Sequence, residues 1–187
     1  MPSHPRRHTI LSGLLALGLL AGTALTAGPA QAASGVGPFY PEPAWDRKLP
    51  ASTRFLILTN WASQAVLDKE TGLVWERSPD STPSNWFNAR FACTNKTVGN
   101  RKGWRLPSFP ELVSLVDPAN STPSLPTGNP FEGVQSALYW SAASFPESPS
   151  LAWGVHFGNG GVNVIGKTVT ITIHAWCVRG GMNAEAY

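Results

Sequence analysis

Positively charged side chains are concentrated in one stretch of this 187-residue chain. No acidic residue lies between Asp80 and Glu111, whereas five basic residues do: Arg90, Lys96, Arg101, Lys102 and Arg105. Guanidinium and ammonium groups bind sulfate and carboxylate groups through charge-assisted hydrogen bonds. We therefore predict an anion-binding face made of four of these residues: Arg90, Lys96, Arg101 and Lys102. The alternative is a solvated helix end and loop, with Arg105 bonding backbone carbonyls or a buried acid.

The pair Cys93 and Cys177, the only cysteines in the chain, is a second candidate for chemistry. In an oxidising compartment an even pair usually forms a disulfide, and the N-terminus described below indicates export. Closing so long a loop would contribute on the order of 4 kcal/mol in the chain-entropy model. A reactive or metal-binding pair is the alternative, although no His or acidic ligands lie nearby at zinc spacing.

Residues for general acid–base catalysis are scarce. Beyond residue 32 the only imidazoles are His156 and His174, and the chain has no Gly-x-Ser-x-Gly elbow, phosphate-binding loop or His-Glu-x-x-His motif. His156 alternates with apolar residues in a strand-like run, so we interpret it as a surface or packed histidine rather than a general base. We therefore predict a non-catalytic protein without cofactor or metal.

The first 32 residues are predicted to be a signal peptide. Arg6 and Arg7 precede an uncharged apolar stretch at residues 10–27, and Ala30, Gln31 and Ala32 have the small-x-small pattern of a signal peptidase site. An uncleaved membrane anchor is the alternative, because the stretch is near the minimum of about 17 residues for a membrane span. We expect a secreted or periplasmic protein, whose membrane contact is limited to an uncleaved signal.

The remaining 155 residues are nearly neutral, because removal of two arginines leaves 12 basic and 11 acidic side chains, a net charge of +1. This balance gives no support for a nucleic-acid partner, and the length fits one domain. We predict a proline-rich arm or linker at 33–54, the domain at 55–181 and a tail at 182–187, and make no prediction of oligomeric state.

Elements with helical and strand periodicity surround these candidates. We expect a strand at 55–59 and a hairpin that joins 65–68 to 73–76 around Gly72. A helix should follow Ser84, with Cys93 on its apolar face. A second helix should start at Ser108, where Glu111 completes a capping box and Pro110 suits the first turn.

The second half of the chain has mainly strand character. Residues 120–135 are rich in Pro, Ser, Thr and Gly and are predicted to form a long loop, and five strands are expected after it, at 138–141, 151–157, 162–165, 168–173 and 176–179. Two early helices and late strands predict the α+β class, with two short helices packed on an antiparallel β-sheet. Of the eight tryptophans, Trp45 and Trp61 lie outside the periodic runs and are the best candidates for exposed aromatics.

Five ordered blocks of the sequence resemble the Lcl C-terminal domain family of exported bacterial proteins, at 68–75, 86–93, 103–112, 139–141 and 177–180. Their order and spacing match over about residues 55–181. The resemblance implies a C-type-lectin-like fold in which a disulfide joins a helix to the last strand, and Cys93 and Cys177 occupy the matching places. The family's namesake belongs to a collagen-like adhesin that binds sulfated polysaccharides. We therefore expect a binding or adhesion module, with a sulfated or acidic polysaccharide as its partner.

Several sequence motifs of better-known relatives are absent from this chain, and their absence limits which functions of those relatives we expect here. The chain lacks the Glu-Pro-Asn type loop and Trp-Asn-Asp strand of calcium-dependent lectins, and Glu132 and Glu147 are the only carboxylates at 120–147, too few to predict a calcium site. No Gly-X-Y repeat precedes the domain. A structural cell-envelope component, or a cysteine-dependent enzyme related to formylglycine-generating oxidases, are the alternatives to a binding module.

Overall fold

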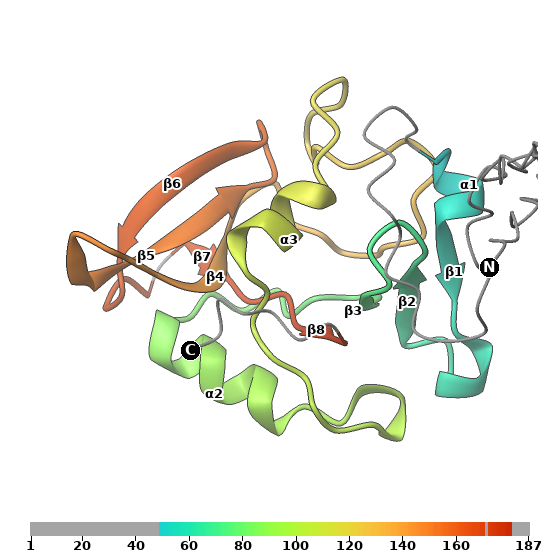
Figure 1. The fold of residues 1–187 in the computed structure, drawn as a ribbon, viewed down its shortest axis with the longest axis horizontal. Helices are drawn as coiled ribbons and strands as arrows, with labels where there is room; N and C mark the ends of the chain where they lie inside the picture. The colour runs from blue at the N-terminus through green and yellow to red at the C-terminus, as the bar shows by residue number, and fades with distance from the viewer. Residues whose placement is uncertain (1–48, 171, 181–187) are drawn as a thin grey trace, which may run out of the picture. The chain divides into compact units, whose positions relative to one another are not determined.

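The computed structural model describes residues 49–170 and 172–180 (Figure 1). Contacts divide the chain into two units, Met1–Ser34 and Gly35–Tyr187, and all described residues belong to the second. The predicted signal peptide, most of the proline-rich arm, Trp45 and the tail lie outside the described residues. Within the described part of the chain, no helix is both long enough and apolar enough to cross a membrane.

One sheet contains the predicted hairpin. Its strand order is β1 (Phe55–Ile57), β2 (Ala65–Asp68), β3 (Val74–Glu76) and β8 (Val178–Arg179), with every neighbouring pair antiparallel. Gly72 lies in the turn between β2 and β3 at a φ of +70°, which a residue without a Cβ adopts at no steric cost. The hairpin prediction is confirmed, whereas β8 reaches this sheet from the far end of the sequence.

The second sheet is mixed, whereas the sequence predicted antiparallel pairing. Its order is β6 (Gly161–Gly166), β5 (Ser148–His156), β4 (Leu138–Phe145) and β7 (Ile173–His174), and β4 pairs with β7 in parallel. The prediction of one antiparallel sheet is therefore wrong. Of the described residues in the predicted strand at 168–173, only Ile173 lies in a strand, because the chain must cross from the β6 edge to the far side of β4 before it can pair there.

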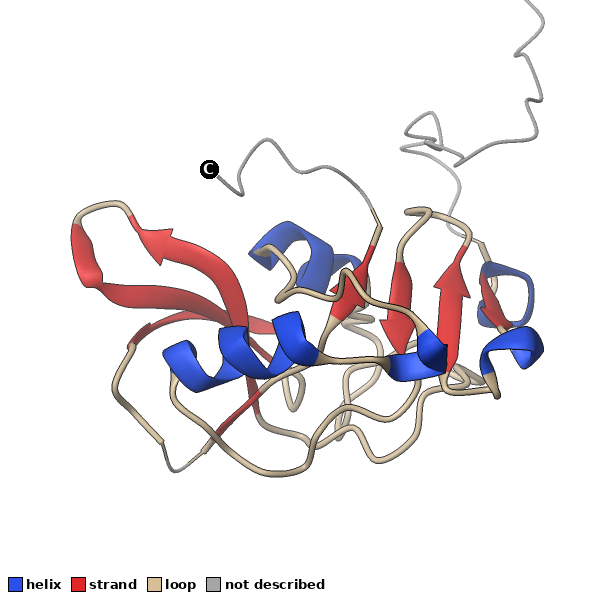
Figure 2. Ribbon diagram, turned by 90° about the horizontal axis from the view of Figure 1, so that it is seen from below, coloured by secondary structure: helices blue, strands red, loops and turns tan. Residues whose placement is uncertain are grey.

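In the described part of the chain, three α-helices pack around these sheets: α1 (Ala51–Arg54), α2 (Trp86–Asn95) and α3 (Phe109–Ser114). In Figure 1 α3 lies between the two sheets, and Figure 2 shows the longest helix, α2, in front of the strands. Helix α1 falls within the segment predicted to be an arm. Its Arg54 is 1% exposed and binds Asp68 at 2.7 Å, so the packed domain begins before Phe55.

The α3 start has the predicted capping box. The Ser108 hydroxyl accepts a hydrogen bond from the Glu111 N–H at 3.4 Å, and the Glu111 carboxylate accepts one from the Ser108 N–H at 2.8 Å. Helix α2 has a different cap from the expected one: the Asn85 side chain accepts from the Asn88 N–H. Both caps satisfy N–H groups that have no partner within the helix.

The core consists of two clusters of buried side chains. One surrounds Trp75 and Trp176, whose rings meet edge to face at 5.5 Å. The other surrounds Cys93 and includes Trp104 and Trp140. Five of the tryptophans within the periodic runs are buried: Trp75, Trp86, Trp104, Trp140 and Trp176. Residues 120–135 form the predicted loop without helix or strand. Short helices and two sheets place the domain in the α+β class.

Candidate anion-binding site

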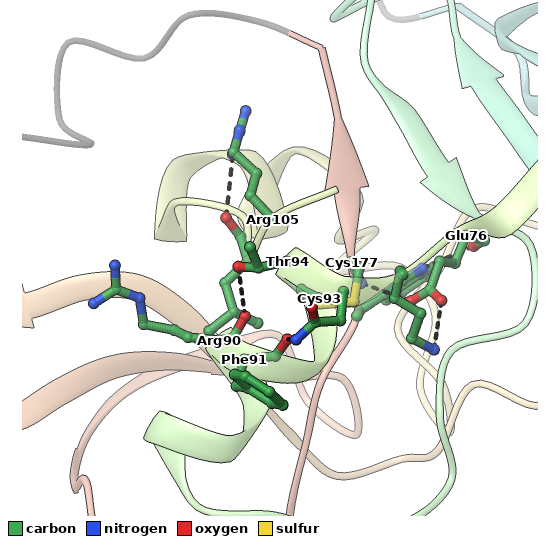
Figure 3. The surroundings of a disulfide bond; sticks show 11 residues. Glu76, Arg90, Phe91, Cys93, Thr94, Arg105 and Cys177 are labelled. Atoms are coloured by element: carbon green, nitrogen blue, oxygen red, sulfur yellow. Dashed lines mark hydrogen bonds and ion pairs between the residues drawn. A yellow bond between two sulfur atoms is a disulfide. The ribbon is translucent and has the colours of Figure 1, made fainter. Parts of the chain in front are cut away.

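A disulfide joins Cys93 of α2 to Cys177, directly before β8 (Figure 3). The two Cα atoms are 5.3 Å apart, and both side chains are fully buried. Cys93 points inward because Trp86, Ala89 and Cys93 share one face of the helix. The disulfide prediction is confirmed, and the alternative of a free reactive or metal-binding pair is wrong.

Lys96, one of the four predicted anion ligands, is engaged by a carboxylate. Its Nζ lies 2.8 Å from Oε1 of Glu76, whose side chain is 2% exposed. The other Glu76 oxygen, Oε2, accepts a hydrogen bond from the Cys177 N–H at 2.8 Å. Burial raises the pKa of Glu76, while Lys96 and the Cys177 N–H oppose that increase. Lys96 therefore neutralises a buried acid beside the disulfide.

Arg90, the second predicted ligand, lies on another side of α2. Its guanidinium lies 4.6 Å from the centroid of the Trp86 ring, and the Lys167 ammonium lies 4.1 Å from the same ring. In Figure 3 Arg90 and Glu76 extend from opposite sides of the disulfide. Arg90 and the Lys96–Glu76 pair therefore belong to separate parts of the surface.

The two remaining predicted ligands, Arg101 and Lys102, meet a residue that the sequence did not identify as a ligand. The guanidinium groups of Arg101 and Arg179 lie 5.5 and 5.4 Å from the centroid of one ring, that of Trp61. Arg179 Nε also donates to the Lys102 carbonyl at 2.8 Å. We call Trp61, Arg101, Lys102 and Arg179 the Trp61 cluster.

Local geometry fixes the ring at the centre of this cluster. Trp61 is half-buried, ends the 3₁₀ turn η1 (Thr59–Trp61), and meets Trp104 edge to face at 6.5 Å. Gly99, in the 3₁₀ turn η2 (Val98–Asn100), approaches so closely that a Cβ there would lie 2.6 Å from the Trp61 Cβ. A side chain at position 99 would displace the ring.

The sequence did not predict Arg179 as an anion ligand, because no pattern in the neighbouring residues indicates that role. It lies 74 residues beyond Arg105, and β8 comes beside the basic stretch through long-range contacts, the disulfide and the antiparallel bridge between Arg105 and Val178. Arg105 itself has the structural role left open by the sequence. It binds both Glu111 carboxylate oxygens at 2.8 Å and the Gly180 carbonyl at 2.8 Å.

Comparison with known protein families identifies the domain. Residues 64–179 match the model of the Lcl C-terminal domain. The chain belongs to this family. No curated protein matches the chain.

Three cations of this Lcl C-terminal domain are available to an anion. Within residues 49–180 apart from 171, no ion pair joins Arg101, Lys102 or Arg179 to a carboxylate. The two guanidinium carbons lie within about 11 Å of each other, the sum of their 5.5 and 5.4 Å distances to one ring centroid. Two like charges at this separation repel each other, so a negative group near either guanidinium would lower the electrostatic energy of the pair.

Both imidazoles of the Lcl C-terminal domain are engaged in packing and turn formation. His156 Nδ1 accepts the Gly158 N–H at 2.9 Å in the turn after β5. His174 is 7% exposed and packs on Tyr139, and burial lowers its pKa. Among the described residues, no three His, Cys, Asp or Glu side chains are grouped to hold a metal ion.

Proposed function

We propose that this protein is an exported, non-catalytic binding or adhesion module whose ligand is a polyanionic glycan, a sulfated or acidic polysaccharide. The observation that carries the proposal is the Trp61 cluster. Two guanidinium groups lie over one indole, the exposed Lys102 follows Arg101 directly in the chain, and none of these three cations has a carboxylate partner among the described residues.

The chemistry of the cluster favours sulfate and carboxylate groups. Guanidinium is planar and presents paired N–H donors that match the oxygens of these anions. Packing against Trp61 limits the freedom of both arginine side chains, so less conformational entropy is lost on binding. A polymer that carries several anionic groups would engage Arg101, Lys102 and Arg179 together.

Export and a C-type-lectin-like architecture are parts of the same proposal. The apolar N-terminal segment with its small-x-small site supports export, and a disulfide is typical of proteins that leave the reducing cytoplasm. The lectin-like interpretation is supported by the connection of the longest helix to the segment before the last strand through Cys93 and Cys177.

Heparin chromatography tests the proposal. The double variant Arg101→Glu with Lys102→Glu replaces two cations of the cluster with anions, so we expect elution at a clearly lower salt concentration than for the wild type. Retention of the wild type should also fall steeply with ionic strength, because exposed charges are screened over about 8 Å at physiological salt.

A charge-matched control isolates the cluster. Lys69→Glu with Arg90→Glu makes the same change in net charge at exposed positions outside the cluster and should leave most of the retention intact. Equal loss in both double variants would show a nonspecific charge effect. Unchanged retention of the Arg101 and Lys102 variant would contradict the proposed site.

A further inference from the structure

A cleft of about 490 Å³ lies beside the Lys96–Glu76 pair, bounded by the end of β3, the turn between η1 and β2, the segment from the end of α2 to the start of η2, and the loop at 120–135. Small-molecule sites usually occupy about 300–1,000 Å³. Gln64, in the turn between η1 and β2, joins this turn to η2, because its Oε1 accepts the Gly99 N–H at 2.9 Å. We call this space the Lys96 cleft.

The charges that line the Lys96 cleft are already balanced in pairs. Lys96 pairs with Glu76 at 2.8 Å, and Arg77 pairs with Glu132 at 2.5 Å. An anion bound to either cation would compete with an existing carboxylate and leave that carboxylate without its partner. The cleft therefore favours a ligand without net charge, in contrast to the Trp61 cluster.

The remaining lining is rich in groups that bond hydroxyls. Ser63, Ser78 and Thr97 contribute side-chain hydroxyls, and Gln64 contributes an amide whose NH₂ group has no hydrogen-bond partner among the described residues. Among the described residues, Val98 is the one apolar side chain in the lining. No aromatic or aliphatic wall is present in the described cleft for an apolar ligand to contact.

We propose that the Lys96 cleft is a binding site for a neutral, hydroxyl-rich ligand, a single uncharged sugar unit. A sugar hydroxyl both donates and accepts hydrogen bonds, so it bonds the N–H groups of Lys96 that do not point at Glu76, and it bonds Glu132 Oε2, which a 3.5 Å contact with the Ser78 hydroxyl leaves with acceptor capacity, without separating either ion pair. Several such hydroxyls on one ring match the hydroxyls and the amide of the lining. This site does not depend on polyanion binding at the Trp61 cluster.

Titration of the full chain, with its disulfide intact, tests the site. ¹⁵N-labelled protein is titrated with the methyl glycosides of glucose, galactose, mannose and N-acetylglucosamine while amide shifts are followed by NMR. We expect at least one glycoside to give saturable shifts centred on Ser78, Thr97 and Val98. Absence of shifts with all four, or shifts centred on Trp61, would overturn the proposal.

A variant with a side chain that blocks the cleft tests whether the glycoside binds there. Ser78→Trp places an indole at the rim, from an exposed position, and should weaken glycoside binding by at least tenfold. Ser81→Trp adds the same indole at an exposed position outside the cleft and should bind as the wild type does. Equal binding by the two variants would overturn the proposal.

The heparin experiment distinguishes the two sites. Ser78→Trp should keep wild-type heparin retention, whereas the Arg101 and Lys102 double variant should keep glycoside binding. Loss of glycoside binding in that double variant, with its amide spectrum otherwise unchanged, would assign the glycoside to the Trp61 cluster and overturn the cleft site.

Discussion

At the scale of single residues, burial shifts the protonation equilibrium of Glu76. Burial is the largest influence and raises the pKa of Glu76 above the ordinary 4.5, against the opposing effects of Lys96 and the Cys177 N–H. A carboxyl group with a higher pKa in the folded state binds its proton more tightly there than in the unfolded chain. Its contribution to stability is therefore present at low pH and is lost as pH rises above about 4.5 through the folded pKa.

This sign gives a direct prediction for Glu76→Gln. Glutamine does not titrate, so the free energy of unfolding of the wild type relative to the variant should be largest near pH 4 and decrease as pH rises toward 7. Urea unfolding of both proteins at several pH values measures this difference, and other titrating groups cancel in it. A difference that grows with pH would contradict a raised Glu76 pKa.

At the scale of elements, one carboxylate joins the start of α3 to β8. Glu111 caps the helix through the Ser108 N–H and binds Arg105, which in turn binds the Gly180 carbonyl. The capping part of this arrangement is local and was predictable from Ser108 and Glu111 alone. The Arg105 contact to Gly180 joins residues far apart in the sequence and was not.

The two contacts of Glu111 predict an order of stability losses. Ser108→Ala removes one cap acceptor and should cost about 1 kcal/mol. Glu111→Ala removes the other half of the cap and leaves the half-buried Arg105 without its carboxylate, so it should cost about 2–3 kcal/mol. Chemical denaturation compares the two variants, and a larger loss for Ser108→Ala would contradict the role given to the Arg105–Glu111 pair.

At the scale of the whole molecule, sequence patterns predicted individual turns, helix faces and caps better than the pairing of distant strands. The turn at Gly72, the inward face that carries Cys93 and the α3 cap depend on neighbours within about four residues, so their signals are local. The parallel pairing of β7 with β4 depends on a crossover with no local signature. The Trp61 cluster depends on the same kind of distant pairing, because β8 supplies Arg179.

Two separate sets of contacts hold β8 beside the rest of the domain near the proposed site. The disulfide joins α2 to the segment before β8, and reciprocal backbone hydrogen bonds of 2.9 Å join Arg105 to Val178. Arg179 then bonds the Lys102 carbonyl directly. The backbone contacts hold Arg101 and Arg179 beside Trp61 without passing through the sulfur atoms.

Removal of the disulfide should therefore lower the stability of the fold without weakening heparin binding. Cys93→Ser with Cys177→Ser should lower the free energy of unfolding by about 2–5 kcal/mol, chiefly because the unfolded chain is no longer cross-linked. At temperatures where the variant is still fully folded by circular dichroism, heparin retention should match that of the wild type, because the contacts of the Trp61 cluster remain. A folded variant with weakened retention would show that the disulfide itself positions Arg179 for the ligand.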